Sequence, residues 1–190
     1  MHDSADFLSS ANLPRPVDDG AADHLRGLGV PRVLLPSTFG PLVDLSRLCG
    51  PRTVVYCYPM TELPGKPLPQ GWDNIPGAPG GTAQARNFQE HYGEFLSLAV
   101  DIFGMSTQIT EYQGEMARRL HLPFEILSDA ELKFCDALSL PTFQVDGMQL
   151  LKRLTLVIRG RRVEHVLYPV FPPDQSAEQV IQWLKDHPLP

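Results

Sequence analysis

The sequence predicts an α/β domain in which helices flank a mixed central sheet. Three features carry this prediction: an unbroken run of β-branched and aromatic residues near position 55, alternating strand and helix patterns after it, and a strand hairpin followed by a closing amphipathic helix. Alternating β and α segments give parallel strands, whereas two strands joined by a tight turn pair in an antiparallel manner. One sheet should therefore contain both kinds of pairing.

A polar segment, residues 1–30, precedes the domain, which we expect to span residues 31–190. This segment has the composition of a tail that packs late or stays mobile, with a short helical pattern from Asp18 to Leu28. Apolar β formers at 32–36 and 42–46 then flank a turn that contains Gly40 and Pro41. The domain should therefore begin with a β-hairpin.

The next two elements have the clearest patterns. The run TVVYCYP, residues 53–59, is apolar throughout, as expected for a central strand that is buried on both faces. The helix after it carries apolar residues at spacings of 3, 4 and 3, which form one face of a helix: Ala85, Phe88, Tyr92 and Phe95. Thr82 is available as the N-cap of this helix.

The remaining elements follow from the same periodicities of two residues for strands and 3.6 for helices. Asp174 or Ser176 would cap the last of these elements, which is the helix expected at residues 176–187. In chain order, strands are expected at residues 98–106, 123–129, 142–145, 150–160 and 162–170, and helices at 109–120, 130–138 and 176–187.

Composition and charge exclude several classes of function. The net charge of −6, with no basic run longer than Arg161-Arg162, argues against nucleic acid and anionic membranes as partners. The first residues lack the basic start and apolar run of a signal peptide, so we expect a cytoplasmic protein. Three dispersed cysteines and six histidines show no metal-ligand spacing, so neither a disulfide framework, a metal site nor a cofactor is expected.

The segment from Met60 to Gly81 is too long for a routine connection. It holds five prolines, five glycines and Trp72, and it runs directly into the first helical pattern. Its glycine spacing matches no phosphate-binding motif, since no Lys follows Gly81. Two interpretations remain for Trp72: a recognition element, or a side chain that packs the loop over the core.

Several segments resemble one family position by position. PGGTAQARNFQEHYGEF is similar to the P-G-C-T-x-x-A-C-x-F-x-x-x-Y segment of bacterioferritin-comigratory-type peroxiredoxins, and four other stretches match this family: TVVYCYP, VDIFGMSTQ, LPFEILSD and KRLTLVI. The resemblance extends from residue 31 to residue 184. It implies a thioredoxin-like (peroxiredoxin) fold, which agrees with the element order above.

The reactive residues of that family are missing here. Gly81 stands where the peroxide-attacking cysteine is expected, Arg86 where a resolving cysteine often lies, and Ala78 where the family has Thr or Ser. Thr82 and Arg153 do match the family. Glycine offers no nucleophilic atom. The resemblance therefore implies a peroxidase scaffold that, with Gly81, has no peroxidase activity.

The other thiols are weaker candidates. Cys57 lies within the buried central strand, where a low dielectric raises a thiol pKa, so a structural role is expected. Cys135 and Cys49 could each be a remote resolving thiol, although packing or surface roles fit them better. Arg153 has a purely structural alternative of its own, which is an ion pair with Glu164 on the adjoining strand.

Three functional hypotheses follow from the resemblance. The first is a thiol peroxidase scaffold for hydrogen peroxide or organic hydroperoxides, with a thioredoxin-like or small-thiol reductant, in which Gly81 is either natural or replaces Cys or selenocysteine. The second is a non-catalytic protein that binds a small anion at Gly80, Gly81, Thr82 and Arg153, with Trp72 in a recognition loop. The third is new chemistry on an anionic substrate, with Arg86 and Arg153. The family often dimerises, so a homodimer is also expected.

Overall fold

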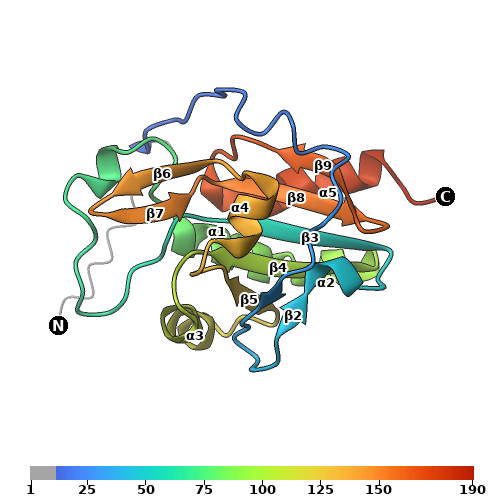
Figure 1. Ribbon diagram of the computed structural model, residues 1–190, viewed down its shortest axis with the longest axis horizontal. Helices are drawn as coiled ribbons and strands as arrows, with labels where there is room; N and C mark the ends of the chain where they lie inside the picture. The colour runs from blue at the N-terminus through green and yellow to red at the C-terminus, as the bar shows by residue number, and fades with distance from the viewer. Residues whose placement is uncertain (1–11) are drawn as a thin grey trace.

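The central sheet has five strands in the order β5-β4-β3-β8-β9 (Figure 1). In this computed structural model, which describes residues 12–190, β3 pairs in parallel with β4, and β4 in parallel with β5, whereas β8 is antiparallel to both β3 and β9. The bounds are β3 (Arg52–Cys57), β4 (Val100–Ser106), β5 (Glu125–Ser128), β8 (Leu154–Arg159) and β9 (Arg162–Leu167). The expected mixed sheet is confirmed.

Two small antiparallel pairs, five α-helices and three short 3-10 helices complete the regular structure of the described residues. The pairs are β1 (Leu34–Leu35) with β2 (Val43–Asp44), and β6 (Thr142–Val145) with β7 (Met148–Leu151). The helices are α1 (Gly81–Glu90), α2 (Tyr92–Ser97), α3 (Thr110–Arg119), α4 (Lys133–Leu138) and α5 (Ser176–Asp186). The N-terminal hairpin and the helical patterns expected after residue 80 are confirmed, although the first of these helices is divided into α1 and α2 at His91.

The central strand β3 separates two hydrophobic clusters. Val54 and Tyr56 point into a cluster with α1, α2, α3 and α5, whereas Val55 and Cys57 point into a cluster with α4 and the N-terminal segments. All six residues of β3 are buried, as its unbroken apolar sequence predicts. The helices therefore lie on both faces, and α1 and α4 lie on opposite ones.

The N-terminal segment packs along β9 in its described part. Leu25 is fully buried, and the backbone N–H groups of Gly27 and Val30 donate to the carbonyl oxygens of Val163 and Arg161 at 2.8 and 2.9 Å. Because these N–H groups bond to the sheet, they are not available for helical i→i−4 bonds, and the helix expected from residue 18 to residue 28 is a series of turns. The first eleven residues of the expected tail lie outside the described residues.

The strand expected over residues 150–160 is two strands. β7 pairs with β6, β8 pairs with β3 and β9, and the chain changes partner at Lys152 and Arg153. The Lys152 N–H donates to the Pro141 carbonyl at 2.8 Å, which holds the junction to the start of the β6–β7 hairpin. A continuous apolar pattern could not show this break because it is set by pairing with distant strands.

Helix α5 is capped by a residue of another helix. The Asn87 side chain of α1 accepts a hydrogen bond from the Ala177 N–H at 2.6 Å, and both groups are buried. The expected cap by Asp174 or Ser176 is wrong, since no side chain of the segment before α5 caps it. Asn87 therefore fixes α5 against α1.

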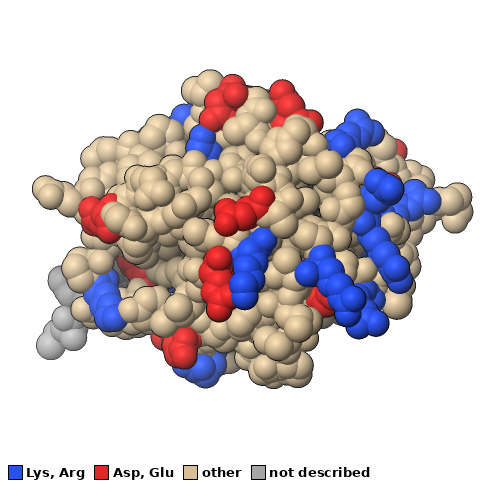
Figure 2. Space-filling view, in the orientation of Figure 1, with Lys and Arg blue, Asp and Glu red and all other residues tan. Residues whose placement is uncertain are grey.

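Charged groups are unevenly placed on the face shown in Figure 2, where Lys and Arg gather toward the right-hand side. This is the side of the β8–β9 turn in Figure 1. Among residues 12–190, no helix combines the length and the apolarity that a bilayer span requires.

We expect Asn87→Ala to lower the free energy of unfolding by about 1–2 kcal/mol, because it leaves a buried helix N–H without an acceptor. Chemical denaturation would measure the change. Glu90→Ala is the matched control on the same helix, where the side chain is exposed and a change within about 0.5 kcal/mol is expected. Equal stability of both variants would contradict the cap.

Candidate functional site

Arg153 is the buried cation of the site, and the break between β7 and β8 positions it. Its side chain is only 3% exposed. Nη1 donates to the side-chain oxygen of Gln84, and Nη2 donates to the carbonyl oxygens of Ala78 and Pro79 at 3.1 and 3.0 Å. The guanidinium therefore joins the last residues of the Pro-rich segment to the first turn of α1.

The acceptors around Arg153 are all neutral. In the described part of the chain no carboxylate lies within ion-pair distance of it, and the expected pair with Glu164 is wrong, because Glu164 pairs with Arg52 at 2.7 and 2.8 Å. Burial lowers the pKa of Arg153 to about 9, partly offset by Tyr56 and Tyr58. The guanidinium still carries its charge at neutral pH, so the site holds an uncompensated buried cation.

Two glycines form the start of α1. Gly80 is the N-cap, with a φ of 101°, and an added Cβ there would lie 2.4 Å from the Cγ of Pro173. The N-cap expected at Thr82 is wrong, because Thr82 is already the second residue of the helix. Arg153 therefore contacts the two residues directly before this N-cap and, through Gln84, the first turn of α1.

The position that matches the family's reactive cysteine has no room for a side chain. A Cβ added to Gly81 would lie 2.6 Å from the Met60 carbonyl oxygen and 2.9 Å from the Cγ2 of Thr61. Both distances are shorter than any ordinary contact of a Cβ, and the nearer atom belongs to the backbone. The segment at residues 60–61 therefore fills the space that a cysteine at position 81 would need.

Gln108 fixes that segment in place. Its side-chain amide pairs with the Thr61 peptide in both directions: Oε1 accepts from the Thr61 N–H at 3.0 Å, and Nε2 donates to the Thr61 carbonyl at 3.0 Å. The backbone of Gln108 is itself held by the hydroxyls of Ser106 and Ser128, at 3.3 and 2.7 Å. A continuous set of buried hydrogen bonds thus runs from the ends of β4 and β5 to Thr61, the residue after Met60.

Trp72 packs the Pro-rich segment against the β6–β7 hairpin. It lies in a short 3-10 helix (Trp72–Asn74), is 4% exposed, and its ring centroid is 6.2 Å from that of Phe143. Ala78 and Leu150 complete this small cluster. In Figure 1 the segment curves around the hairpin on the left. Trp72 holds the loop and presents little surface to a ligand.

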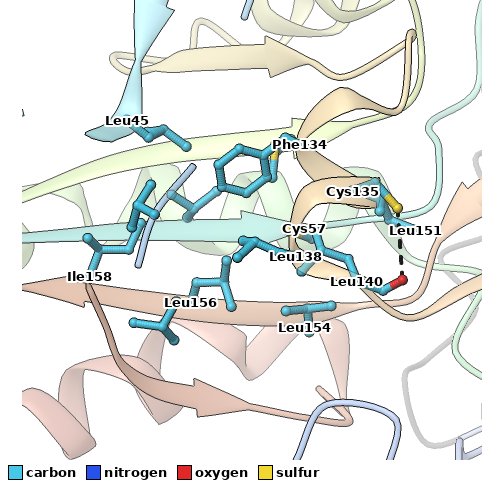
Figure 3. Close-up of a cluster of buried hydrophobic side chains, with 14 of the residues drawn as sticks. Leu45, Cys57, Phe134, Cys135, Leu138, Leu140, Leu151, Leu154, Leu156 and Ile158 are labelled. Atoms are coloured by element: carbon cyan, nitrogen blue, oxygen red, sulfur yellow. Dashed lines mark hydrogen bonds between the residues drawn. The ribbon is translucent and has the colours of Figure 1, made fainter. Parts of the chain in front are cut away.

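The three cysteines are all free, and two of them are buried. Cys57 and Cys135 lie in the cluster of Figure 3, on the sheet face opposite α1. Burial raises the pKa of Cys57 well above its usual range, and burial followed by Asp129 raises the pKa of Cys135 to about 11. Both thiols are protonated at neutral pH, which confirms the structural role expected for Cys57. Cys49 is exposed and donates to the Arg47 carbonyl at 3.5 Å.

The structure brings most of the expected site residues together. Gly80, Gly81 and Thr82 begin α1, and Arg153 contacts residues on both sides of them, while Trp72 lies in the packed cluster behind the loop. Arg86 is exposed on α1. Among residues 12–190 no group of His, Cys, Asp and Glu is arranged to hold a metal ion.

Sequence reasoning missed three contributors to the site: Gln84, Gln108 and the Met60 carbonyl. Gln84 follows Gly81 by three residues, so helical spacing alone would have placed it near the first turn. No sequence signal connects Gln108 to Thr61, because their pairing depends on how the Pro-rich segment folds back over the sheet.

Comparison with known proteins gives a consistent result. The family model described as Redoxin matches residues 27–181. Peroxiredoxin Bcp of Escherichia coli (strain K12) is 27% identical over 161 residues, which cover 83% of this chain and 93% of that protein. Chloroplastic peroxiredoxin Q of Populus jackii is 26% identical over 161 residues, which cover 84% of this chain and 68% of that protein.

Solved structures of peroxiredoxins resemble this chain in fold as well. The crystal structure of peroxidoxin BcpB from Mycobacterium tuberculosis superposes with a TM-score of 0.69 at 24% identity and covers 85% of this chain and 96% of that one. Peroxiredoxin Q of Xanthomonas campestris gives a TM-score of 0.64 at 20% identity, with 92% and 98% coverage. The expected thioredoxin-like peroxiredoxin fold is confirmed.

We expect Gly81→Ala to lower the free energy of unfolding by about 1–3 kcal/mol, because its methyl group must displace the Met60 backbone. Gly93→Ala is the matched control, since an added Cβ at this exposed α2 residue meets nothing within 4 Å. The control should be neutral or stabilising by up to about 1 kcal/mol, as is usual for Gly→Ala in a helix. If Gly81→Ala were as stable as Gly93→Ala, position 81 would have room for a side chain.

Proposed function

The chain belongs to the redoxin family, and from this premise we propose that it is a Bcp/PrxQ-like peroxiredoxin whose peroxidase site has become a non-catalytic anion site. One observation carries the proposal: the Met60 carbonyl oxygen lies 2.6 Å from where a Cβ at position 81 would be. A site that had lost only its sulfur would keep the space for it. Here the surroundings fit glycine, which supports Gly81 as a natural residue of the chain.

The chemistry of a thiol peroxidase requires a thiolate at the start of α1. There the first-turn N–H groups, the helix dipole and a guanidinium lower the pKa of a cysteine, and the thiolate attacks the peroxide O–O bond. The two buried thiols of this chain have raised pKa values and face away from α1. Cys49 precedes β3, whereas Met60 follows it, so the length of the central strand separates the exposed thiol from the site.

The parts of the site that would stabilise negative charge are still present. Arg153 remains buried and charged, no carboxylate of residues 12–190 pairs with it, and its Nη1 contacts Gln84 in the first turn of α1. Removing the nucleophile while keeping the cation supports binding of a small anion in place of peroxide reduction. A regulatory or anion-binding role is therefore the function that the site supports best.

We expect the unaltered chain, supplied with a thioredoxin system or dithiothreitol, to reduce hydrogen peroxide and cumene hydroperoxide at least about a thousandfold more slowly than Bcp of Escherichia coli, because loss of a nucleophile costs that much or more. Peroxide consumption coupled to reductant oxidation would measure this. Turnover comparable to Bcp that disappears in Cys49→Ser would contradict the proposal.

Gly81→Cys distinguishes a site adapted to glycine from one that lacks a single atom. The Met60 backbone should hinder the new side chain, so we expect this variant to stay at least about a hundredfold below Bcp in the same assay. Recovery of Bcp-like turnover by this one change would show that the pocket had kept its catalytic geometry, and would contradict the adaptation to glycine.

A further inference from the structure

A cavity of about 270 Å³ lies next to Arg153, away from the filled position at Gly81. Segments far apart in the sequence enclose it: residues 16–17 of the N-terminal segment, residues 75–77 at the end of the Pro-rich segment, β6, the β7–β8 junction, and the residues that follow β9. Its size is close to the lower limit of ligand pockets, about 300 Å³.

The walls of the cavity are mainly apolar. Apolar side chains in them are those of Val17, Ile75, Phe143 and Pro169. The ring of Phe143 also packs against that of Trp72. Aliphatic and aromatic walls of this kind favour a ligand with an apolar body, because binding removes apolar surface from water on both sides. A bare inorganic anion would gain nothing from them.

Two adjacent cations, Lys152 and Arg153, line the same cavity. Lys152 is already paired, since its Nζ lies 2.5 Å from a carboxylate oxygen of Asp19. Arg153 forms no ion pair in the described part of the chain, where its acceptors are one amide oxygen and two backbone carbonyls. A buried charge without a counter-ion is costly, so an anionic group that reached Arg153 would bind favourably.

Two polar groups that line the cavity, on Lys152 and Tyr168, already hold the carboxylate of Asp19. Asp19 accepts from the Tyr168 hydroxyl at 2.7 Å and pairs with Lys152, and these two contacts hold the pKa of Asp19 well below its usual range. The N-terminal segment is thus attached to the cavity rim through a carboxylate. The Gly77 N–H also donates to the Pro14 carbonyl, at 3.3 Å, which holds the same segment to the Pro-rich loop.

We propose that this cavity binds a small carboxylic acid with an aromatic or aliphatic body, its carboxylate directed toward Arg153 and its body against Ile75 and Phe143. The inference rests on the proposed non-catalytic function and names its ligand class. The apolar walls favour an aromatic or aliphatic group in the ligand, and the positive charge of Arg153 favours its carboxylate. A neutral molecule of the same shape lacks the second interaction.

An NMR titration with phenylacetate, and with phenylacetamide as the neutral control, tests the proposal. We expect phenylacetate to bind at least about tenfold more tightly, because only the acid gains the Coulomb attraction of Arg153. Backbone amide shifts should concentrate at Ile75, Gly77, Phe143 and Tyr168. Equal binding of acid and amide, shifts elsewhere in the chain, or no binding of the acid up to about 20 mM would each overturn the proposal.

Charge changes at Val17 provide a matched pair of variants. This residue lines the cavity yet is 81% exposed, so both Val17→Asp and Val17→Lys should keep the melting temperature of the parent. Repulsion should weaken phenylacetate binding by about fivefold in Val17→Asp, whereas Val17→Lys should bind as well as the parent or better. Identical affinities in the two variants would overturn the proposal.

The peroxidase assay tests the proposed non-catalytic function separately from the proposed carboxylate site. Carboxylate binding without peroxide turnover supports both proposals, and turnover without carboxylate binding overturns both. Binding together with Bcp-like turnover would support the cavity as a carboxylate site and overturn the non-catalytic function.

Discussion

The pairing of the Gln108 side chain with the Thr61 peptide determines what the site can do. Two hydrogen bonds of 3.0 Å hold the backbone at residues 60–61 against the start of α1. An amide that pairs with a peptide in both directions satisfies a donor and an acceptor in a buried place, so the segment has a strong reason to stay there. With Met60 in this position, only glycine fits at position 81.

Arg153 connects the other parts of the molecule to this arrangement. Its Nη2 holds the carbonyls of Ala78 and Pro79, and its Nη1 holds Gln84 one turn further along α1. These contacts use the guanidinium to order the Pro-rich segment, but they leave its charge uncompensated. The same residue therefore stabilises the loop and provides the positive charge that an anion would need.

Much of the fold could be predicted from local patterns. The buried strand β3 and the helices α1, α3 and α5 were predicted because an apolar periodicity records which faces are covered. The break at Lys152 and Arg153 could not be predicted, since it depends on which distant strands β7 and β8 pair with. The cap of α5 by Asn87 is a contact between helices and was missed for the same reason. At the site, the resemblance identified Gly81 and Arg153, but the approach of Met60 to Gly81 follows from the path of the Pro-rich segment, which no periodicity records.

The most direct test of this account is a double-mutant cycle of Gly81→Ala and Gln108→Ala, measured as free energies of unfolding. If Gln108 holds Met60 against position 81, its removal lets the segment move, and the cost of Gly81→Ala should fall by about 1 kcal/mol or more in the Gln108→Ala background. Costs that add to within about 0.5 kcal/mol would show that the two positions are independent and would contradict the account.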